Sequence, residues 1–257
     1  MVPTLPCSSG LSPKLDPVLP HLPEQDSPDL GAASIHGPAT APGPTVAIAT
    51  SYAALQLPGA AYTKRWTADE ASKMLPDIIE TARLRLRPFR LQDVDDVLVY
   101  ATDPEWARYL PVPQPYTQAD AETFIVGQVL LDREVHPAWA IAHAGAVIGG
   151  INLRFHCDHH VGEMGYSIAR SYWGRGLTTE VARAVMEAAF AAYASLHRIR
   201  AMADARNIGS LRVMEKLGIV REGVLRQDRL VRGECIDEVW CGVLRPEWEA
   251  QRCRRGN

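Results

Sequence analysis

The pattern of apolar and polar residues divides the chain into an irregular N-terminal part and a region where strands and helices alternate. Leucine and arginine alternate in residues 83–89, which is the period of a half-buried strand. Apolar residues repeat at helical spacing in residues 91–101, 117–134, 177–194 and 207–218. Further strands are predicted over 163–169 and 198–205, in a hairpin over 138–155 that turns near Ala144 and Gly145, and in two strands after residue 218. This order predicts a mixed sheet domain of the α/β or α+β class.

The first part of the chain has a different composition. Residues 1 to about 60 are rich in proline, glycine, serine and alanine and match neither strand nor helix spacing. Such a segment cannot bury a core, so we expect a disordered tail. The tail is either a tether or an over-long gene model, since Met74 stands just before the first strand. We expect a linker over 61–79, with a short helix over 67–79, and a folded domain over 80–250.

Length and charge limit the possible functions. The 257 residues, 47% of them apolar, suffice for one core of about 150–200 residues and some additional chain. A net charge of −3 argues against the basic face that nucleic acid requires, so no nucleic-acid partner is expected. No apolar run approaches the roughly 20 residues that cross a bilayer, and no signal peptide is recognised, so no membrane partner is expected.

The cysteines and histidines favour a protein without metal. Five cysteines are scattered with no C-x-x-C spacing, which is typical of reduced thiols and predicts a cytoplasmic location. Cys235 and Cys241 lie an even number of positions apart on one predicted strand, so we expect them to share a face and pack in the core or sheet. Residues 156–160, HCDHH, lie in a predicted turn where neighbours do not easily converge on one ion. A solvated hairpin loop is favoured over a zinc site.

The segment from Ser171 to Glu180, SYWGRGLTTE, joins a predicted strand to a long helix. The first N–H groups of a helix have no partner within the helix, and the helix dipole adds about half a positive charge there. Gly174 and Gly176 carry no Cβ, so the main chain can approach a bulky ligand closely. The segment therefore predicts an anion-binding loop, and the alternative is an ordinary turn punctuated by glycine.

Several blocks then follow one another in a recognisable order. They are ETARLRLRPF from residue 80, GEMGYSIA from residue 162, the glycine loop, and LHRIRAMADARNIGSLRVMEKLG from residue 196. In these blocks the chain resembles the GCN5-related N-acetyltransferases (GNAT), more narrowly their RimJ/RimL branch, from Glu80 to Trp248. The resemblance implies the GNAT fold, a mixed and mostly antiparallel central sheet flanked by helices. Its splayed central strands, here near Met164–Ile168 and Ile199–Asp204, hold acetyl-CoA.

Acetyl-CoA is the implied cosubstrate, and the family's pyrophosphate loop, Q/R-x-x-G-x-G/A, falls on residues 173–178. Trp173 replaces the family-wide Gln or Arg, and Thr178 replaces the small last residue. Backbone N–H groups do the binding, so these changes are tolerable where the side chains point away. The resemblance implies that acetyl-CoA is bound by Tyr166, Ser167, Ile168, Trp173, Gly174, Arg175, Gly176, Leu177, Thr178, Thr179 and Asn207.

The resemblance also implies catalytic residues. Gly165 fits a bulge or a close backbone approach, where free N–H groups would hold the thioester carbonyl, and the alternative is a glycine that merely relieves crowding. In the family the Asn matched by Asn207 contacts the pantetheine arm, and the Ser matched by Ser210 meets the departing thiolate. Asn207 also suits a helix N-cap. Glu163 is the candidate base, acting directly or through water, with a structural carboxylate as the alternative. Tyr166 is expected in the core more often than in catalysis.

These residues predict an N-acetyltransferase that moves an acetyl group from acetyl-CoA to a primary amine. Direct attack is expected, since no cysteine lies in a motif with a base. The RimJ/RimL resemblance suggests a protein N-terminal amine as acceptor. The alternatives are a small amine, such as a polyamine, aminoglycoside or other antibiotic, and a non-catalytic acyl-CoA-binding module. A monomer or a homodimer is expected.

Overall fold

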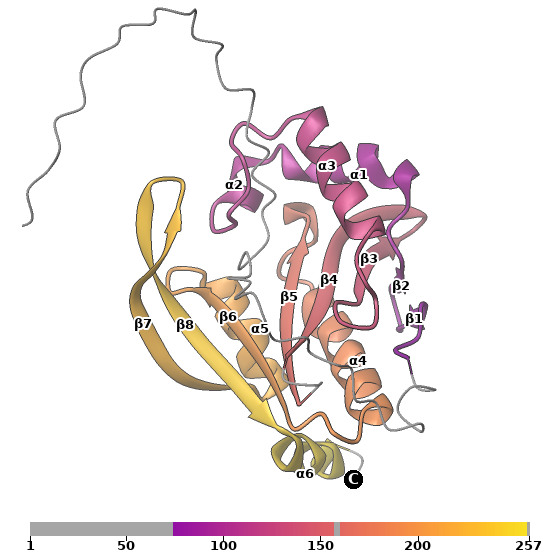
Figure 1. Cartoon of the computed structure of the whole chain (residues 1–257), viewed down its shortest axis with the longest axis vertical. Helices are drawn as coiled ribbons and strands as arrows, with labels where there is room; N and C mark the ends of the chain where they lie inside the picture. Colours follow the sequence, from indigo (N-terminus) through magenta and orange to yellow (C-terminus); the bar gives the residue numbers. More distant parts are fainter. Residues whose placement is uncertain (1–73, 157–159, 256–257) are drawn as a thin grey trace, which may run out of the picture. The chain divides into compact units, whose positions relative to one another are not determined.

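Eight strands pair into one sheet in the part of the chain that the structure, a computed structural model, describes: residues 74–156 and 160–255 (Figure 1). The strands are β1 (Ile79–Glu80), β2 (Arg85–Arg87), β3 (Ala138–His143), β4 (Ala146–His156), β5 (Val161–Ile168), β6 (Arg198–Asp204), β7 (Val220–Val231) and β8 (Glu234–Leu244). Their order across the sheet is β1-β2-β3-β4-β5-β6-β8-β7. Within this sheet β5 and β6 are parallel and all other neighbours are antiparallel, as predicted.

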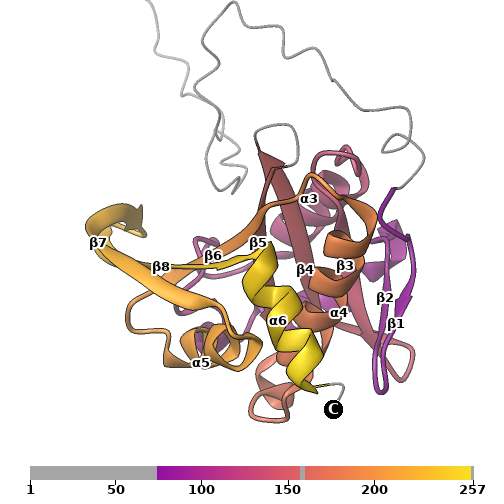
Figure 2. The same cartoon turned by 90° about the horizontal axis from the view of Figure 1, so that it is seen from below.

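Helices cover both faces of the sheet (Figure 2). The α-helices are α1 (Val94–Ala101), α2 (Pro104–Ala107), α3 (Gln118–Val129), α4 (Leu177–Ala192), α5 (Ile208–Leu217) and α6 (Arg245–Arg255), and the 3-10 turns are η1 (Leu91–Asp93) and η2 (Arg170–Tyr172). α4, α5 and α6 lie on one face, and α3 lies on the other (Figure 2). We call these the α4 face and the α3 face. α1 packs beside α3 and against β4.

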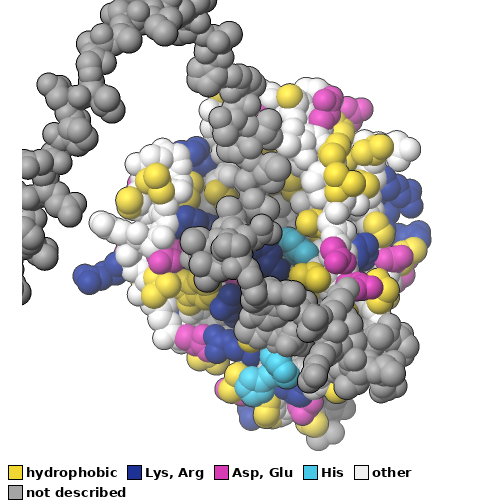
Figure 3. All heavy atoms as spheres, in the orientation of Figure 1, with side chains coloured by type: hydrophobic (Ala, Val, Ile, Leu, Met, Phe, Trp, Pro, Cys, Tyr) yellow, Lys and Arg dark blue, Asp and Glu magenta, His cyan; other side chains and the backbone are white. Residues whose placement is uncertain are grey.

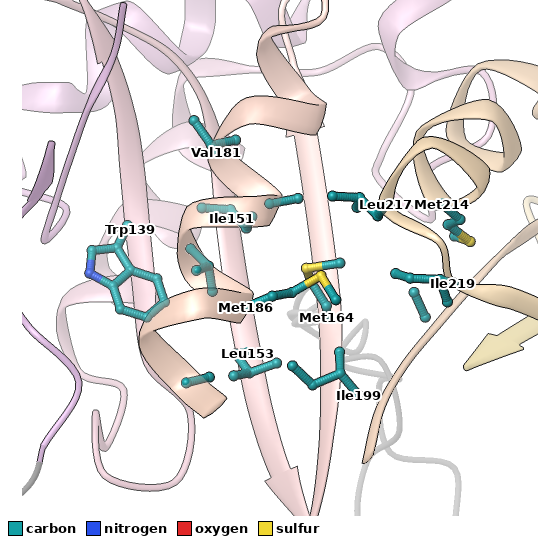
Figure 4. Packing of buried hydrophobic residues seen from close by; sticks show 14 of the residues in the cluster. Trp139, Ile151, Leu153, Met164, Val181, Met186, Ile199, Met214, Leu217 and Ile219 are labelled. Atoms are coloured by element: carbon teal, nitrogen blue, oxygen red, sulfur yellow. The ribbon is translucent and has the colours of Figure 1, made fainter. Parts of the chain in front are cut away.

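Strand alternation explains the larger core. In β4, Ile151, Leu153 and Phe155 are buried while the residues between them are partly exposed. The buried set points to the α4 face, where it meets α4 side chains such as Val181 and Met186 (Figure 4). A second cluster lies between α1, α2 and α3 and the other face of β3 and β4, and it includes Phe89, Val97, Tyr100, Trp106, Tyr116, Ile125, Ala140, Val147 and Ala169. The period-2 pattern therefore decides which layer each side chain joins.

α4 connects the one parallel pair. A parallel connection needs a crossover of a dozen or more residues, and α4 supplies it between β5 and β6. β5 and β6 lie side by side at their N-terminal ends and diverge toward their C-terminal ends (Figure 1). The glycine loop follows the C-terminal end of β5, which is where ligands bind in open α/β sheets.

Most predicted elements are confirmed. The Thr117–Asp120 capping box opens α3, Asn207 caps α5, and Gly218 ends α5 at a φ of 75°. The hairpin turns at Ala144 and Gly145, both with positive φ. The sequence analysis did not predict β1, α2 or α6. β1 has two residues and α2 has four, which is too short for a period to show.

Two smaller predictions are wrong. Cys241 is buried, but Cys235 is exposed, so the two do not share a packed face. The reason is that β6 pairs with β8 only from Leu244 to Glu238, and Cys235 lies beyond the end of that layer. The helix predicted over 67–79 is absent from residues 74–79, where Ile79 begins β1. Residues 67–73 of that helix, and the tail predicted over 1–60, lie outside the described residues.

Charged side chains of both signs lie on the surface, as the small net charge suggests. Acidic and basic side chains are interspersed over the face drawn in Figure 3. Among the described residues, no helix combines the length and apolar character that crossing a membrane demands.

Residues just before Glu80 belong to the core rather than to a linker. Leu75 is 5% exposed and Ile79 is 8% exposed, and both join the larger core cluster. The carbonyl oxygen of Pro76 accepts a hydrogen bond from the buried indole of Trp139 (3.1 Å), and Asp77 pairs with Arg133 (3.1 Å). Leu75 and Ile79 therefore belong to the folded domain.

A chain that begins at Met74 is expected to unfold at the same urea concentration as the full chain. A chain that begins at Thr81 loses Leu75, Ile79 and β1. Burial of each aliphatic side chain contributes about 1.5–3 kcal/mol, so its free energy of unfolding should fall by about 3–6 kcal/mol. Urea unfolding followed by circular dichroism measures the stability of both shortened chains and of the full chain. Equal stability of the two shortened chains would contradict the placement of Leu75 and Ile79 in the core. A clear loss of stability in the chain that begins at Met74, relative to the full chain, would contradict the first expectation.

Candidate active site

The candidate site begins where β5 and β6 part. Their pairing consists of Val161 with Arg198, Gly162 with Ile199, and Glu163 with Arg200. β5 continues to pair with β4 as far as Ile168, and β6 continues to pair with β8 as far as Asp204. The inner edges of Met164–Ile168 and Ala201–Asp204 therefore have no strand partner. This confirms the predicted splay, except that Ile199 is still paired.

The glycine loop follows at the C-terminal end of β5. Gly174 and Gly176 have φ of 73° and 74°, in the left-handed region that glycine adopts without strain. Gly176 is the N-cap of α4, and its carbonyl accepts the first helical hydrogen bond, from the Glu180 N–H (3.1 Å). Within the described residues, the N–H groups of Gly176, Leu177, Thr178 and Thr179 have no hydrogen-bond partner. They form the unpaired helix start that the sequence predicts.

A clamp holds this loop. The Nη1 of Arg83 donates to the carbonyl oxygen of Arg175 (3.0 Å). The Nε and Nη2 of Arg83 contact Oε2 of Glu180 at 2.7 and 2.6 Å, and its backbone N–H donates to Oε1 (3.0 Å). Burial opposes the charge on Glu180, but hydrogen bonds from Thr81 and Arg83 outweigh it and hold the pKa of Glu180 below its ordinary value. The clamp thus ties the segment between β1 and β2 to the first turn of α4.

The side chains of the loop do not all face a ligand. The indole N–H of Trp173 donates to the carbonyl oxygen of Ile168 (2.8 Å), so Trp173 fastens the loop to the end of β5. Leu177 is 4% exposed and packs into the core, as does Ile168 at 6%. The guanidinium of Arg175 lies over the ring of Tyr172, 5.3 Å from its centre. Leu177 and Ile168 are thus limited to main-chain contacts with a ligand.

The start of α5 brings Asn207, Ser210 and Tyr166 together. The side-chain oxygen of Asn207 accepts a hydrogen bond from the Ser210 N–H (3.1 Å), which confirms the cap. The hydroxyl of Tyr166 lies 3.0 Å from the Ser210 hydroxyl and 3.2 Å from its carbonyl oxygen. Burial raises the pKa of Tyr166 to about 12, against the opposing effect of its bond to Ser210. Tyr166 is therefore a neutral hydrogen-bond donor at neutral pH.

Glu163 lies at the last position of β5 that pairs with β6, and its Oε2 already has hydrogen-bond donors. Arg200 donates to this atom from Nη2 (2.8 Å) and Nε (3.1 Å). The Nε2 of His156 lies 3.5 Å from the same oxygen, in contact but too far for a good hydrogen bond. Burial lowers the pKa of His156, and the charge of Arg200 adds to this against the attraction of Glu163. His156 is therefore a neutral ring at neutral pH, beside an ion pair.

Gly165 lies between these groups but forms no bulge. The register of β4 and β5 is continuous from Ile168 to Val161. A Cβ on Gly165 would lie 3.2 Å from the side-chain oxygen of Asn152, so this glycine makes room for a neighbouring side chain. The neighbour is a side chain and not backbone, so the contact supports the alternative that Gly165 relieves crowding.

The predicted residues form two groups rather than one. Tyr166 and Ser210 lie on the α4 face, whereas Glu163 alternates to the α3 face of β5. The sequence analysis missed Arg83, Arg200 and His156. His156 was assigned to the loop, but it ends β4, and only the alternation of Asn152, Arg154 and His156 in β4 signalled a polar face opposite the core. No sequence signal linked Arg83 to Glu180.

Metal ligands do not gather at this site. Across residues 74–156 and 160–255, no cluster of three or more histidine, cysteine, aspartate or glutamate side chains could hold an ion. Residues 157–159 of the HCDHH segment lie outside the described range. The strands on either side of that segment pair as a hairpin, as predicted.

The chain is similar to known proteins. Residues 83–220 match the model of the acetyltransferase (GNAT) domain family. The N-acetyltransferase YnaD of Bacillus subtilis, itself uncharacterised, is 31% identical over 170 residues, which cover 66% of this chain and 98% of YnaD. The putative ribosomal N-acetyltransferase YdaF of the same organism is 33% identical over 90 residues, 35% of this chain and 49% of YdaF.

A solved structure of a GNAT-family protein has a similar fold. A GNAT-family acetyltransferase from Bacillus anthracis superposes with a TM-score of 0.60 and 27% identity, covering 66% of this chain and 99% of that one. The family model spans more than half of the chain, and it includes β2, the glycine loop, α4 and α5. The chain therefore belongs to the GNAT family and is an acetyl-CoA-dependent N-acetyltransferase.

Proposed function

We propose that this enzyme acetylates the N-terminal α-amine of a protein, as a member of the RimJ/RimL branch, with acetyl-CoA bound between β5 and β6. The observation that carries the proposal is the Tyr166–Ser210 pair beside the parted strands. Support for the acceptor comes from the blocks that resemble this branch and from the similarity to YdaF, a putative ribosomal N-acetyltransferase. A cytoplasmic location stays a prediction from the scattered cysteines.

The glycine loop fits the pyrophosphate of acetyl-CoA. The unpaired N–H groups from Gly176 to Thr179 are donors without protein acceptors among the described residues, and the α4 dipole favours an anion there. A shallow pocket of about 510 Å³ along α4 is lined by Gly176, Thr179, Arg183 and Lys216, and also by Glu80, Glu180 and Glu187. Nη1 of Arg183 is buried without a partner in the described residues. These two cations are the proposed neighbours of the phosphate-bearing end of the molecule.

The pantetheine arm is proposed to pass between the inner edges of β5 and β6. Main-chain groups from Met164 to Ile168 have no strand partner on this side and suit its amide groups. Asn207 uses its side-chain oxygen for the helix cap, which leaves its NH₂ group to donate to the arm. N–H groups near Gly165 are the proposed donors to the thioester oxygen, where negative charge develops during attack.

Ser210 is the proposed donor to the leaving sulfur. The amine nitrogen attacks the thioester carbon, the C–N bond forms, and the C–S bond breaks. The sulfur departs as a thiolate that accepts a hydrogen bond from the Ser210 hydroxyl, and the proton that the amine gives up goes to the base. If the proton of Tyr166 goes to the Ser210 carbonyl, the hydroxyl proton of Ser210 is left for the sulfur. Tyr166 thus orients Ser210, and its high pKa keeps it a donor.

Proton removal from the amine is assigned to the Glu163 side of β5. Arg200 occupies Oε2 of Glu163, so the amine or a bridging water would use the other oxygen, or neutral His156 would accept the proton. An α-amine, with an ordinary pKa near 8, needs less help from a base than a lysine near 10.4. A weakly assisted site therefore suits an N-terminal acceptor.

A panel of acceptors tests the substrate class. We expect peptides with free N-termini to give faster release of CoA thiol than polyamines or aminoglycosides at equal concentration. The same peptides with blocked N-termini are the matched control and should lose the activity. Faster thiol release with a polyamine or an aminoglycoside, or acetyl-CoA binding without release for every amine, would overturn the assignment.

The loop assignment predicts the effect of Gly176→Glu. The left-handed backbone costs an L-residue about 1–2 kcal/mol, and the carboxylate would repel the pyrophosphate. We expect the Kd of acetyl-CoA, measured by titration calorimetry, to rise at least about tenfold, a loss of about 1.4 kcal/mol.

Gly233→Glu is the matched control, because Gly233 also has a positive φ, 85°, and open space around it, but it lies in the β7–β8 turn. It should cost similar stability and leave the Kd unchanged. Equal affinity for acetyl-CoA in Gly176→Glu and the unaltered enzyme would refute the loop assignment.

The proposed role of Ser210 predicts a slower chemical step. Ser210→Ala should lower kcat roughly 10- to 1,000-fold and change the Kd of acetyl-CoA little. The α5 cap persists, because Asn207 accepts from the backbone N–H at that position. Tyr166→Phe should also lower kcat, and the double variant should lose little more than Ser210→Ala, because the two residues act as one unit. Additive losses, or an unchanged kcat in Ser210→Ala, would leave Ser210 a structural residue.

A further inference from the structure

Asn152 of β4 places its side-chain amide beside Gly165 of β5. The two residues lie opposite each other in the β4–β5 register. Ile151 and Leu153, the neighbours of Asn152 along β4, point to the α4 face (Figure 4), so Asn152 alternates to the α3 face. A Cβ on Gly165 would lie 3.2 Å from Oδ1 and 3.3 Å from Nδ2 of Asn152. The amide therefore occupies the space that a side chain at position 165 would need.

Gly165 lies in the part of β5 that has parted from β6. Glu163 is the last residue of β5 that pairs with β6, so Gly165 is inside the stretch whose inner edge has no strand partner. Gly165 contributes no side chain to the α3 face, and the next residue of β5 on that face is Ser167. The side chain of Asn152 thus reaches from β4 to the beginning of the gap between β5 and β6.

His136, in the loop before β3, holds this amide. Burial lowers the pKa of His136, the charge of Arg154 adds to this, and a hydrogen bond to the side chain of Asn152 acts in the opposite direction. A bond that favours the protonated ring is one in which the ring donates, because a protonated imidazole has no acceptor. The side-chain oxygen of Asn152 therefore accepts from His136, and the NH₂ group of Asn152 is oriented by that bond.

We infer that Asn152 is a further catalytic residue, whose NH₂ group donates a hydrogen bond to the thioester oxygen of acetyl-CoA beside the main-chain N–H groups near Gly165. When the amine attacks, an electron pair of the C=O bond moves onto this oxygen, and it returns when the C–S bond breaks. A donor that is held in place beforehand stabilises the charge without reorganisation. His136 is a positioning residue, because it acts through Asn152.

This inference also gives Gly165 a role in the site, since a larger residue would displace the amide of Asn152. It rests on the proposed function only for the position of the thioester beside Gly165. It does not depend on which amine is the acceptor, because charge develops on the same oxygen with every amine.

Variants of Asn152 test the donor. Asn152→Ala removes the NH₂ group, and Asn152→Asp keeps the shape of the side chain but replaces the donor with a negatively charged acceptor. Removal of one donor to an oxyanion slows an enzyme about 100- to 1,000-fold, so we expect kcat to fall by about this factor in Asn152→Ala. The fall should be at least as large in Asn152→Asp. The Kd of acetyl-CoA should change less than about threefold, because the full charge exists only during attack.

A double variant separates hydrogen bonding from the filling of space. In Gly165→Ala the new methyl group would crowd the amide of Asn152, so kcat should fall. Asn152→Ala relieves this crowding, and a side chain that only fills space would let the double variant regain full kcat. We expect the double variant to be as slow as Asn152→Ala alone.

Gly162→Ala is the matched control. Its methyl group would lie 3.0 Å from a side-chain carbon of Leu153, on the α4 face of β5 and within the stretch that still pairs with β6. The variant introduces similar crowding in the same strand, but away from Asn152. Its kcat should equal that of the unaltered enzyme.

The carbonyl stretching frequency of bound acetyl-CoA tests the contact without any acceptor. A hydrogen bond weakens the C=O bond and lowers this frequency, which infrared difference spectra with ¹³C-labelled carbonyl isolate. We expect the unaltered enzyme to lower the frequency relative to free acetyl-CoA, Asn152→Ala to return it part of the way, and Gly162→Ala to leave it at the value of the unaltered enzyme.

The outcomes distinguish this inference from the acceptor assignment. If polyamines or aminoglycosides react faster than peptides, the acceptor assignment fails, while a slow Asn152→Ala enzyme with a raised carbonyl frequency still supports the role of Asn152. An unaltered enzyme that does not lower the frequency would overturn both the inference and the placement of the thioester. An unchanged frequency in Asn152→Ala, or full kcat in the double variant, would overturn the inference alone.

Discussion

The loss of pairing between β5 and β6 after Glu163 and Arg200 is the constraint on which the site depends. Two strands that part leave main-chain N–H and C=O groups without a strand partner, and such groups need another partner when they are buried. In the proposed function this partner is the amide-bearing arm of acetyl-CoA. The sheet tolerates the gap because each strand stays paired on its outer edge, β5 with β4 and β6 with β8. The same loss of strand pairing therefore shapes both the sheet and the proposed ligand site.

The gap is bounded by contacts that join both halves of the sheet. On the α4 face, Tyr166 of β5 meets Ser210 of α5, the helix that follows β6. At the C-terminal ends, Arg232 joins the β7–β8 turn to residues 107–112. At the loop, Arg83 holds the first turn of α4 through Glu180. The first two contacts fasten elements from both sides of the gap, while the inner strand edges stay without a strand partner.

The alternation of side chains along β5 separates the proposed chemistry into two sides. Glu163 lies on the α3 face beside Arg200 and His156, and Tyr166 lies on the α4 face beside Ser210. Amine deprotonation and thiolate departure are thus assigned to opposite faces of one strand. A primary amine would approach from the Glu163 side and the sulfur would leave toward Ser210, which keeps the donor of the leaving group away from the base.

The sequence by itself determined the local features of this protein. Strand period, helix caps at Thr117 and Asn207, and the glycine loop depend on neighbours a few residues apart, so their signals lie within one short window. The tertiary structure decided which distant groups meet. Arg83 pairs with Glu180, and Glu163 pairs with Arg200. Arg232 donates hydrogen bonds to main-chain carbonyl oxygens after α2. These contacts depend on strand order and on where β5 and β6 part. No local pattern encodes them, because the free energy that selects them comes from packing the whole sheet.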